Sequence, residues 1–221
     1  MNQREVPEAK TLTDLACNRL REDIMQGAFE PGSKLRIEQL KQRYGVGATP
    51  LREALYRLSA QGFVTVQGQR GFRAAEMSAR ELTDITELRV VIENLALRKS
   101  IENADNEWES RVVAAFHHLT KAESAPEPEL TEWELHNTKF HAALISQCDS
   151  PWLMRFYEML YDQHKRYRNL ARLNRTSRGS DIHDEHTQIC DAALARDATK
   201  ACEVNERHIR RTADVLSKKL N

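Results

Sequence analysis

Two kinds of hydrophobic pattern divide the chain near residue 76. Up to that point, short helical repeats lead into residues 63–66, where apolar and polar side chains alternate and predict a β-strand. From Ser78 onward the alternation is gone, and apolar residues recur at intervals of three and four between short polar connections. The pattern therefore predicts a mainly α-helical protein of two domains, residues 1–76 and residues 77–221.

The stretch from residue 34 to residue 73 has the order helix, turn, helix, hairpin. A short helix precedes Gly45-Val46-Gly47, which supplies a turn, and the second helix is expected to begin near Thr49-Pro50. Thr49 would be its N-cap, and Pro50 would take the first helical position, where a missing N–H costs nothing. Residues 63–66, a turn over 67–71 and a return strand from Phe72 then predict a β-hairpin. This order is typical of a winged helix-turn-helix.

The outer face of the second helix is available for a partner. Its apolar residues share the inward face, which leaves Thr49, Arg52 and Tyr56 on the side that would enter a major groove. Residues 34–73 hold 8 Lys or Arg against 2 Asp or Glu, although the whole chain carries 33 of each. Such local positive density is expected of a surface that binds the phosphates of double-stranded DNA. The alternative is a small protein-interaction module whose basic residues are merely solvated.

The second domain is predicted to be an all-α bundle. Ser78-Ala79-Arg80-Glu81 and Thr131-Glu132-Trp133-Glu134 have the form of capping boxes, and each is expected to open a helix. Residues 123–129, with two prolines, predict a loop between the helices on either side. Further helices are expected from Trp108 to Leu119, from Ser150-Pro151 to residue 178, and over residues 182–195 and 198–220.

Composition and sequence features indicate the cellular compartment. The four cysteines lie far apart without a CxxC pair, no signal peptide is evident, and no stretch approaches the roughly 20 apolar residues of a membrane helix. The mean hydropathy is −0.65. These features predict a cytoplasmic protein with reduced, buried thiols and no association with a membrane.

Three N-terminal segments carry a resemblance to a known family. PGSKL, LKQRYGVGATPLREALYRL and GFVTVQGQRGF, within about residues 11–75, resemble the reader domain of GntR-type bacterial transcription regulators. The resemblance implies that Thr49, Pro50 and Arg52 belong to the recognition helix, and that Arg70 and Gly71 belong to the wing. Arg36 is expected to contact a phosphate, the alternative being a plain surface residue. Many members have a basic residue where this chain has Ala48, so the operator sequence does not carry over.

The remaining residues, 78–220, resemble the C-terminal FCD effector domain of the FadR group. WELHNTKFHAALISQCDSPWL resembles its (D/N)xxxH helix, and DEHTQICDAALARD and NERHIRR resemble its two later histidine helices. Within the group the chain resembles the CsiR-like regulators, which implies control of carboxylate or amino-acid catabolism.

The resemblance singles out Asn137, His141, His186 and His208 as metal ligands. Asn137 and His141 are four residues apart and share a helix face, whereas the other two lie on later helices. Three imidazole nitrogens and one carbonyl oxygen suit Zn²⁺, Ni²⁺ or a similar first-row ion with open positions. For each histidine, the alternative is a buried ring that is hydrogen-bonded to a neighbour. His183 is the main competitor and is expected to face solvent.

The effector expected at this site is a small carboxylate or dicarboxylate. Neutral ligands leave a divalent ion its full charge, which attracts an anion more strongly than a site containing an aspartate would. Arg89 matches a family arginine that can clamp an effector carboxylate. The alternative for Arg89 is an intrahelical pair with Glu93.

Together these observations predict a homodimeric, metabolite-responsive repressor whose two readers occupy a short DNA palindrome. Symmetric half-sites double the base contacts of one small reader. The first alternative keeps the reader but makes the metal purely structural, or the effector pocket metal-free. The second is a metal-dependent enzyme, but no carboxylate is placed as an obvious general base, and the DNA reader would be unexplained. An enzyme is therefore not expected.

Overall fold

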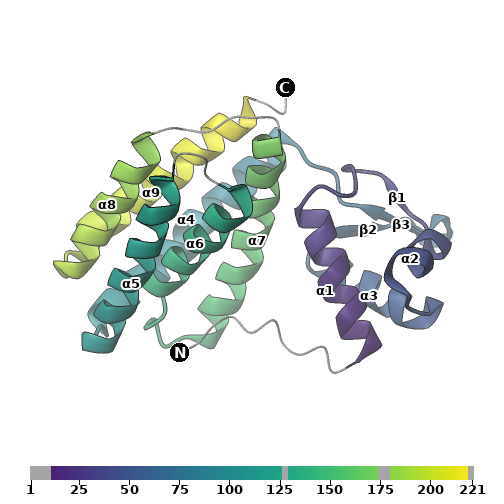
Figure 1. Cartoon of the computed structure of the whole chain (residues 1–221), viewed down its shortest axis with the longest axis horizontal. Coiled ribbons are helices and arrows are strands. Elements are labelled where there is room, and N and C mark those ends of the chain that lie inside the picture. Colours follow the sequence, from purple (N-terminus) through teal and green to yellow (C-terminus); the bar gives the residue numbers. More distant parts are fainter. Residues whose placement is uncertain (1–10, 126–128, 174–179, 219–221) are drawn as a thin grey trace. The chain divides into compact units, whose positions relative to one another are not determined.

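The computed structural model describes residues 11–125, 129–173 and 180–218. It divides into two compact units. One holds the residues up to Ser78 together with Asp162–Leu170, and the other holds Ala79–Tyr161 together with the residues from Ala171 onward. Helices dominate both units, and the strands form one small antiparallel sheet in the first (Figure 1). The predicted fold class, a winged helix-turn-helix followed by a helical bundle, is confirmed.

The first unit packs three helices against a three-stranded sheet. Its helices are α1 (Leu12–Met25), α2 (Ile37–Tyr44) and α3 (Ala48–Ala60), and its strands are β1 (Lys34–Leu35), β2 (Val64–Val66) and β3 (Phe72–Ala74). The strand order is β1-β3-β2. Leu20, Leu51, Leu55 and Phe63 lie at the centre of its core, with almost no exposed surface. The α3 face predicted to be apolar is therefore the one that packs.

The predicted N-cap of α3 was wrong, and the strand β1 was not predicted. α3 begins at Ala48 and has Gly47 as its N-cap without a side-chain hydrogen bond, so Thr49 and Pro50 are the second and third helical residues. Proline is tolerated there because the N–H of the third residue still has no acceptor within the helix; the Leu51 amide is the one that donates to the Gly47 carbonyl, at 3.3 Å. β1 was missed because two residues are too few to show alternation.

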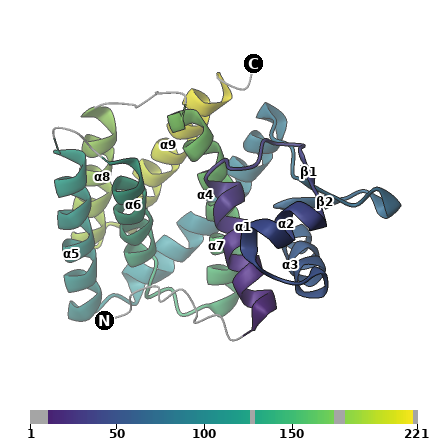
Figure 2. The same ribbon diagram turned by 45° about the vertical axis from the view of Figure 1, so that its right-hand side comes forward.

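The second unit contains the helical bundle. Its helices are α4 (Ala79–Glu102), α5 (Asn106–Glu123), α6 (Leu130–Leu144), α7 (Pro151–Leu173, which contributes residues to both units), α8 (Ser180–Leu194) and α9 (Ala198–Ser217). α4 packs along α9, α5 along α6, and α8 along α9, so α4 and α9 are neighbours although they are far apart in sequence (Figure 2). Trp108, Phe140, Tyr157 and Ile189 are central to the core.

Several helix ends of the bundle differ from the sequence-based predictions. α6 begins at Leu130 with Glu129 as N-cap and no side-chain hydrogen bond, so the box at Thr131 is not a cap, and the helix ends at Leu144 rather than near 147. Glu123 is the last residue of α5 instead of the first of a loop. The predicted ends near residues 178 and 220 lie outside the described residues. No helix among the described residues is long and apolar enough to cross a membrane.

Candidate metal centre and DNA-binding surface

Three histidines from three helices converge inside the bundle. His141 lies on α6, His186 on α8 and His208 on α9, and each offers a ring nitrogen within 4.8 Å of those of the others. All three side chains are buried. The ring centroids of His186 and His208 are 4.8 Å apart, and those of His141 and His208 are 5.3 Å apart. The structure thus brings together the three histidines that the sequence singled out.

The Nδ1 atom of each ring lies within hydrogen-bonding distance of a carboxylate oxygen. The Nδ1 atom of His141 is 3.2 Å from Glu93 Oε1, that of His186 is 2.8 Å from Glu123 Oε1, and that of His208 is 2.8 Å from Glu185 Oε2. A carboxylate can only accept, so each neutral imidazole carries its proton on Nδ1 and presents an Nε2 lone pair. This is the arrangement by which carboxylates orient metal-binding histidines in proteins.

The atoms that would face an ion are the ones without partners. In the described part of the chain, Nε2 of His141, Nε2 of His186 and Oδ1 of Asn137 are buried and form no hydrogen bond. Buried acceptors without a partner are rare because leaving them unsatisfied costs free energy. Asn137 lies one turn before His141, and its Nδ2 donates to the Tyr161 hydroxyl at 3.0 Å, which defines its orientation. The donor set therefore fits a first-row divalent metal ion.

Electrostatics keep Glu93 and Glu123 charged and His141 neutral. Burial raises the pKa of Glu93, but Arg89 and His141 outweigh that effect and bring it to about 2. Burial lowers the pKa of His141 to about 4, although Glu93 opposes the change. Burial also raises the pKa of Glu123, but the hydrogen bonds with His186 and His183 outweigh that effect, so its pKa is lowered overall. The ring of His141 is thus set up to accept a cation rather than a proton.

Arg89 lies directly beside this cluster. Its Nε donates to Glu93 Oε2 at 2.8 Å, and both side chains are almost completely buried. Its guanidinium carbon lies 4.7 Å from the centroid of the Tyr161 ring. The intrahelical pair considered from the sequence is therefore present, and the clamp on an effector carboxylate stays a prediction.

Other histidines occupy different settings. His183 Nδ1 donates to Glu123 Oε2 at 2.8 Å and 39% of its side chain is exposed, so it contacts the same carboxylate as His186 from outside the triad. His117 and His118 are exposed, whereas His164 is completely buried. Sequence reasoning missed Glu123 and Glu185 as partners because only the packing of neighbouring helices brings them to the rings.

The predicted DNA-contacting residues lie on the surface of the first unit. Thr49 and Arg52 on α3 are exposed, as are Arg36 and Arg70, while Pro50 and Gly71 are partly exposed. Their role in DNA binding stays a prediction.

Not all basic residues of this unit are equally available. Arg43 pairs with Asp23 at 2.7 Å and Arg57 pairs with Asp14 at 2.8 Å. Within the described residues, Arg36, Arg52 and Arg70 form no ion pair. The basic residues chosen from the sequence are thus free to meet phosphates.

Comparison with known proteins gives matches over both units. Residues 12–73 match the family of bacterial regulatory proteins described as gntR, and residues 84–211 match the FCD domain. The HTH-type transcriptional repressor GlaR of Escherichia coli strain K12 is 40% identical over 206 residues, which cover 90% of this chain and 93% of that protein. The uncharacterised HTH-type transcriptional regulator BphR of Paraburkholderia xenovorans strain LB400 is 40% identical over 216 residues, covering 96% of this chain and 87% of the relative.

A solved structure has a similar fold. Escherichia coli McbR/YncC superposes with a TM-score of 0.79 at 22% identity, covering 96% of this chain and 99% of that one. At 22% identity the match supports a similar fold and nothing about function.

Proposed function

The chain belongs to the GntR family of bacterial regulatory proteins and carries an FCD domain, and from that premise we propose that it is a dimeric repressor controlled by a small carboxylate bound at a metal ion. It is a DNA-binding transcription regulator, and its relatives are regulators rather than enzymes. The genes under its control would serve carboxylate or amino-acid catabolism, and the protein would act in the cytoplasm as a homodimer on double-stranded operator DNA.

The histidine cluster carries the effector part of this proposal. His141, His186 and His208 each have a carboxylate at Nδ1, and His141, His186 and Asn137 each have a buried acceptor without a hydrogen-bond partner. These four residues would hold the ion, with Zn²⁺ or Ni²⁺ suited to such donors. The ion would supply positive charge and open positions for anionic oxygens. Arg89 would add a cation beside the effector.

On the DNA side, the exposed face of α3 with Thr49 and Arg52 would enter the major groove, and Arg70 and Gly71 of the wing would reach the adjacent groove. Arg36 would contact phosphate. Regulation requires that the effector bind two arrangements of the protein with different affinity, since equal affinity would shift nothing.

A matched pair of variants on α8 tests the metal assignment. His183 and His186 both contact Glu123, but only His186 belongs to the triad. We expect the purified protein to contain about one metal ion per chain by mass spectrometry, His186→Ala to lose it, and His183→Ala to keep it. Equal metal content in the two variants would contradict the assignment.

Ligand binding separates the remaining alternatives. A panel of mono- and dicarboxylates is titrated into metal-loaded and chelator-treated protein by calorimetry and thermal shift. The proposal expects binding only to the loaded form, together with altered DNA affinity. Loss of folding on chelation without any carboxylate response would instead favour a purely structural metal.

A further inference from the structure

The three carboxylates that contact the histidine triad each use both of their oxygens. One oxygen contacts a ring of the triad, and the other accepts a hydrogen bond from a second basic side chain. The three pairs formed in this way are Glu93 with Arg89, Glu123 with His183, and Glu185 with Arg211. A further layer of basic side chains therefore contacts the carboxylates that orient the rings.

Arg211 contacts two carboxylates at once from a neighbouring helix. Its Nη1 donates to Glu185 Oε1 at 2.7 Å, and its Nη2 donates to Asp181 Oδ2 at 3.1 Å. Asp181 and Glu185 are one turn apart on α8, and the planar guanidinium presents its N–H groups in a fixed geometry that suits such a pair. The Arg211 side chain is 46% exposed, whereas that of Glu185 is 3% exposed. Arg211 therefore brings a positive charge from the surface to a buried carboxylate.

This contact also fixes the carboxylate that orients His208. His208 and Arg211 are three residues apart on α9 and share one face of that helix. Glu185 accepts from both of them, with Oε2 at 2.8 Å from His208 Nδ1 and Oε1 at 2.7 Å from Arg211. Because both oxygens are hydrogen-bonded, the carboxylate cannot turn without breaking a contact. The position of Arg211 thus contributes to the orientation of the His208 ring.

We infer that Arg211 is a positioning residue of the metal site, which acts on His208 through Glu185. The inference rests on the proposed metal-binding function and adds a residue to it. Burying an ionised carboxylate is unfavourable unless it is paired and hydrogen-bonded. Loss of Arg211 would remove the contact that fixes one oxygen of Glu185. The His208 ring would then be oriented less precisely toward the ion.

Electrostatic repulsion alone predicts the opposite effect on metal binding. A positive side chain repels a metal cation, so its removal would tighten metal binding if charge were the only influence. A positioning role predicts weaker binding, because the ring that supplies a ligand atom loses part of its support. The sign of the change in metal affinity therefore separates the two explanations.

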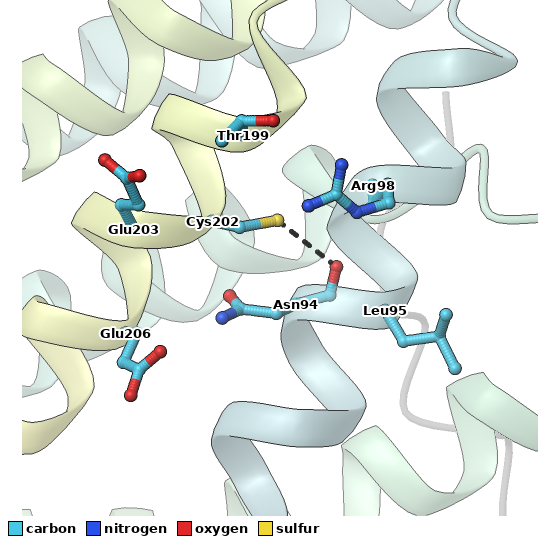
Figure 3. Close-up of a pocket in the computed structure, with 7 residues that line it drawn as sticks. All are labelled: Asn94, Leu95, Arg98, Thr199, Cys202, Glu203 and Glu206. Atoms are coloured by element: carbon cyan, nitrogen blue, oxygen red, sulfur yellow. Dashed lines mark hydrogen bonds between the residues drawn. The ribbon is translucent and has the colours of Figure 1, made fainter.

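The adjacent residue provides a matched control. Arg210 also pairs with a glutamate at 2.7 Å, but its partner Glu206 lies on the same helix and is 43% exposed. Glu206 is one of the residues around the groove between α4 and α9 (Figure 3). Among the described residues that line this groove, none belongs to the histidine triad. Arg210→Gln and Arg211→Gln therefore remove the same charge, but only the second changes the contacts of Glu185.

Competition with a chromophoric chelator measures the Zn²⁺ affinity of the full-length protein. We expect Arg211→Gln to weaken Zn²⁺ binding about tenfold and Arg210→Gln to change it by less than about twofold. In the Glu185→Gln background, Arg211→Gln should weaken binding no further, because Arg211 acts through Glu185. Unchanged or tighter binding by Arg211→Gln, an equal loss in the two arginine variants, or an additive loss in the double variant would overturn the inference.

A spectroscopic readout separates positioning from a purely structural contribution. The visible absorption bands of bound Co²⁺ depend on the geometry of its ligands. At saturating Co²⁺ we expect Arg211→Gln to alter these bands and Arg210→Gln to keep them, while urea unfolding of the chelator-treated variants shows that both fold. Unaltered bands in Arg211→Gln would overturn its positioning role and leave the metal site intact. A wild-type protein that binds neither Zn²⁺ nor Co²⁺ would overturn the metal site itself, and this inference with it.

Discussion

Two histidines of α8 have different roles in the bundle, although both contact the same carboxylate. His183 and His186 lie three residues apart and contact the two oxygens of Glu123, yet His186 is fully buried with a free Nε2 and His183 is partly exposed. The sequence could indicate which histidines share a helix face, because that follows from spacing. It could not indicate the carboxylate behind each ring, because Glu93, Glu123 and Glu185 reach them from other segments.

Glu185 is predicted to act as a positioning residue for His208. Its Oε2 accepts from His208 Nδ1 at 2.8 Å, and its Oε1 accepts from Arg211 at 2.7 Å. In Glu185→Gln an amide can donate to Nδ1 and favour the imidazole tautomer with a proton on Nε2, which cannot bind metal. We expect metal affinity to fall about 10- to 100-fold in chelator competition. Glu132→Gln, at an exposed carboxylate near His136, is the control and should change nothing.

Arg52 is predicted to contribute sequence-specific DNA contacts. It is exposed on α3 and unpaired among the described residues, so Arg52→Ala should leave stability unchanged. One bidentate contact to a base contributes about 1–3 kcal/mol of discrimination, so the preference for operator over random DNA should fall about 10- to 100-fold. Arg57→Ala on the same helix is the comparison, since Arg57 already pairs with Asp14. Undiminished sequence preference of Arg52→Ala in fluorescence anisotropy would count against the assignment.

At the scale of elements, strong periodic segments could be predicted and their ends could not. Gly45 adopts φ 66° at the end of α2, a left-handed conformation that glycine accepts without strain, so the turn was visible in the sequence. The starts of α3 and α6 were misplaced because a Thr near a helix start resembles an N-cap whether or not its oxygen reaches an amide. Whether the hydroxyl caps depends on backbone geometry that side-chain identity does not determine.

A pair of threonine and aspartate variants distinguishes a real cap from an apparent one. Asp105 precedes α5 and its carboxylate accepts from the Trp108 amide at 2.7 Å, whereas Thr131 lies inside α6 and caps nothing. Asp105→Ala should lower the free energy of unfolding by about 1 kcal/mol. Thr131→Ala should change it by less than about 0.5 kcal/mol. Urea denaturation measures both, and an equal loss in the two variants would show that the sequence pattern, rather than the hydrogen bond, matters.

At the scale of the whole molecule, charge and histidine content separate the two functions. Residues 1–75 carry 12 Lys or Arg against 8 Asp or Glu, residues 76–221 carry 21 against 25, and all eight histidines lie in the second part. Each helix from α4 to α9 contributes a residue to the histidine cluster or its contacts, among them Glu93, Glu123, Asn137, Tyr161, His186 and His208. The candidate site therefore exists only when the bundle is assembled, which is why ligand binding there should stabilise the bundle as a unit.

If the effector and DNA are coupled as proposed, each must change the binding affinity of the other. A bundle that merely binds a ligand would show no such reciprocal change. If the carboxylate lowers operator affinity by some factor, operator DNA must lower carboxylate affinity by the same factor, because binding free energies around a thermodynamic cycle are equal. We expect a factor within the usual range of about 5 to 150. Calorimetric titration of the carboxylate into free and operator-bound protein measures one side of the cycle, and anisotropy with and without the carboxylate measures the other. His186→Ala should retain operator binding and lose the coupling on both sides, because it removes a ring from the triad without touching the reader. A carboxylate that binds free and operator-bound protein equally well would mean that the bundle does not control the reader through this site.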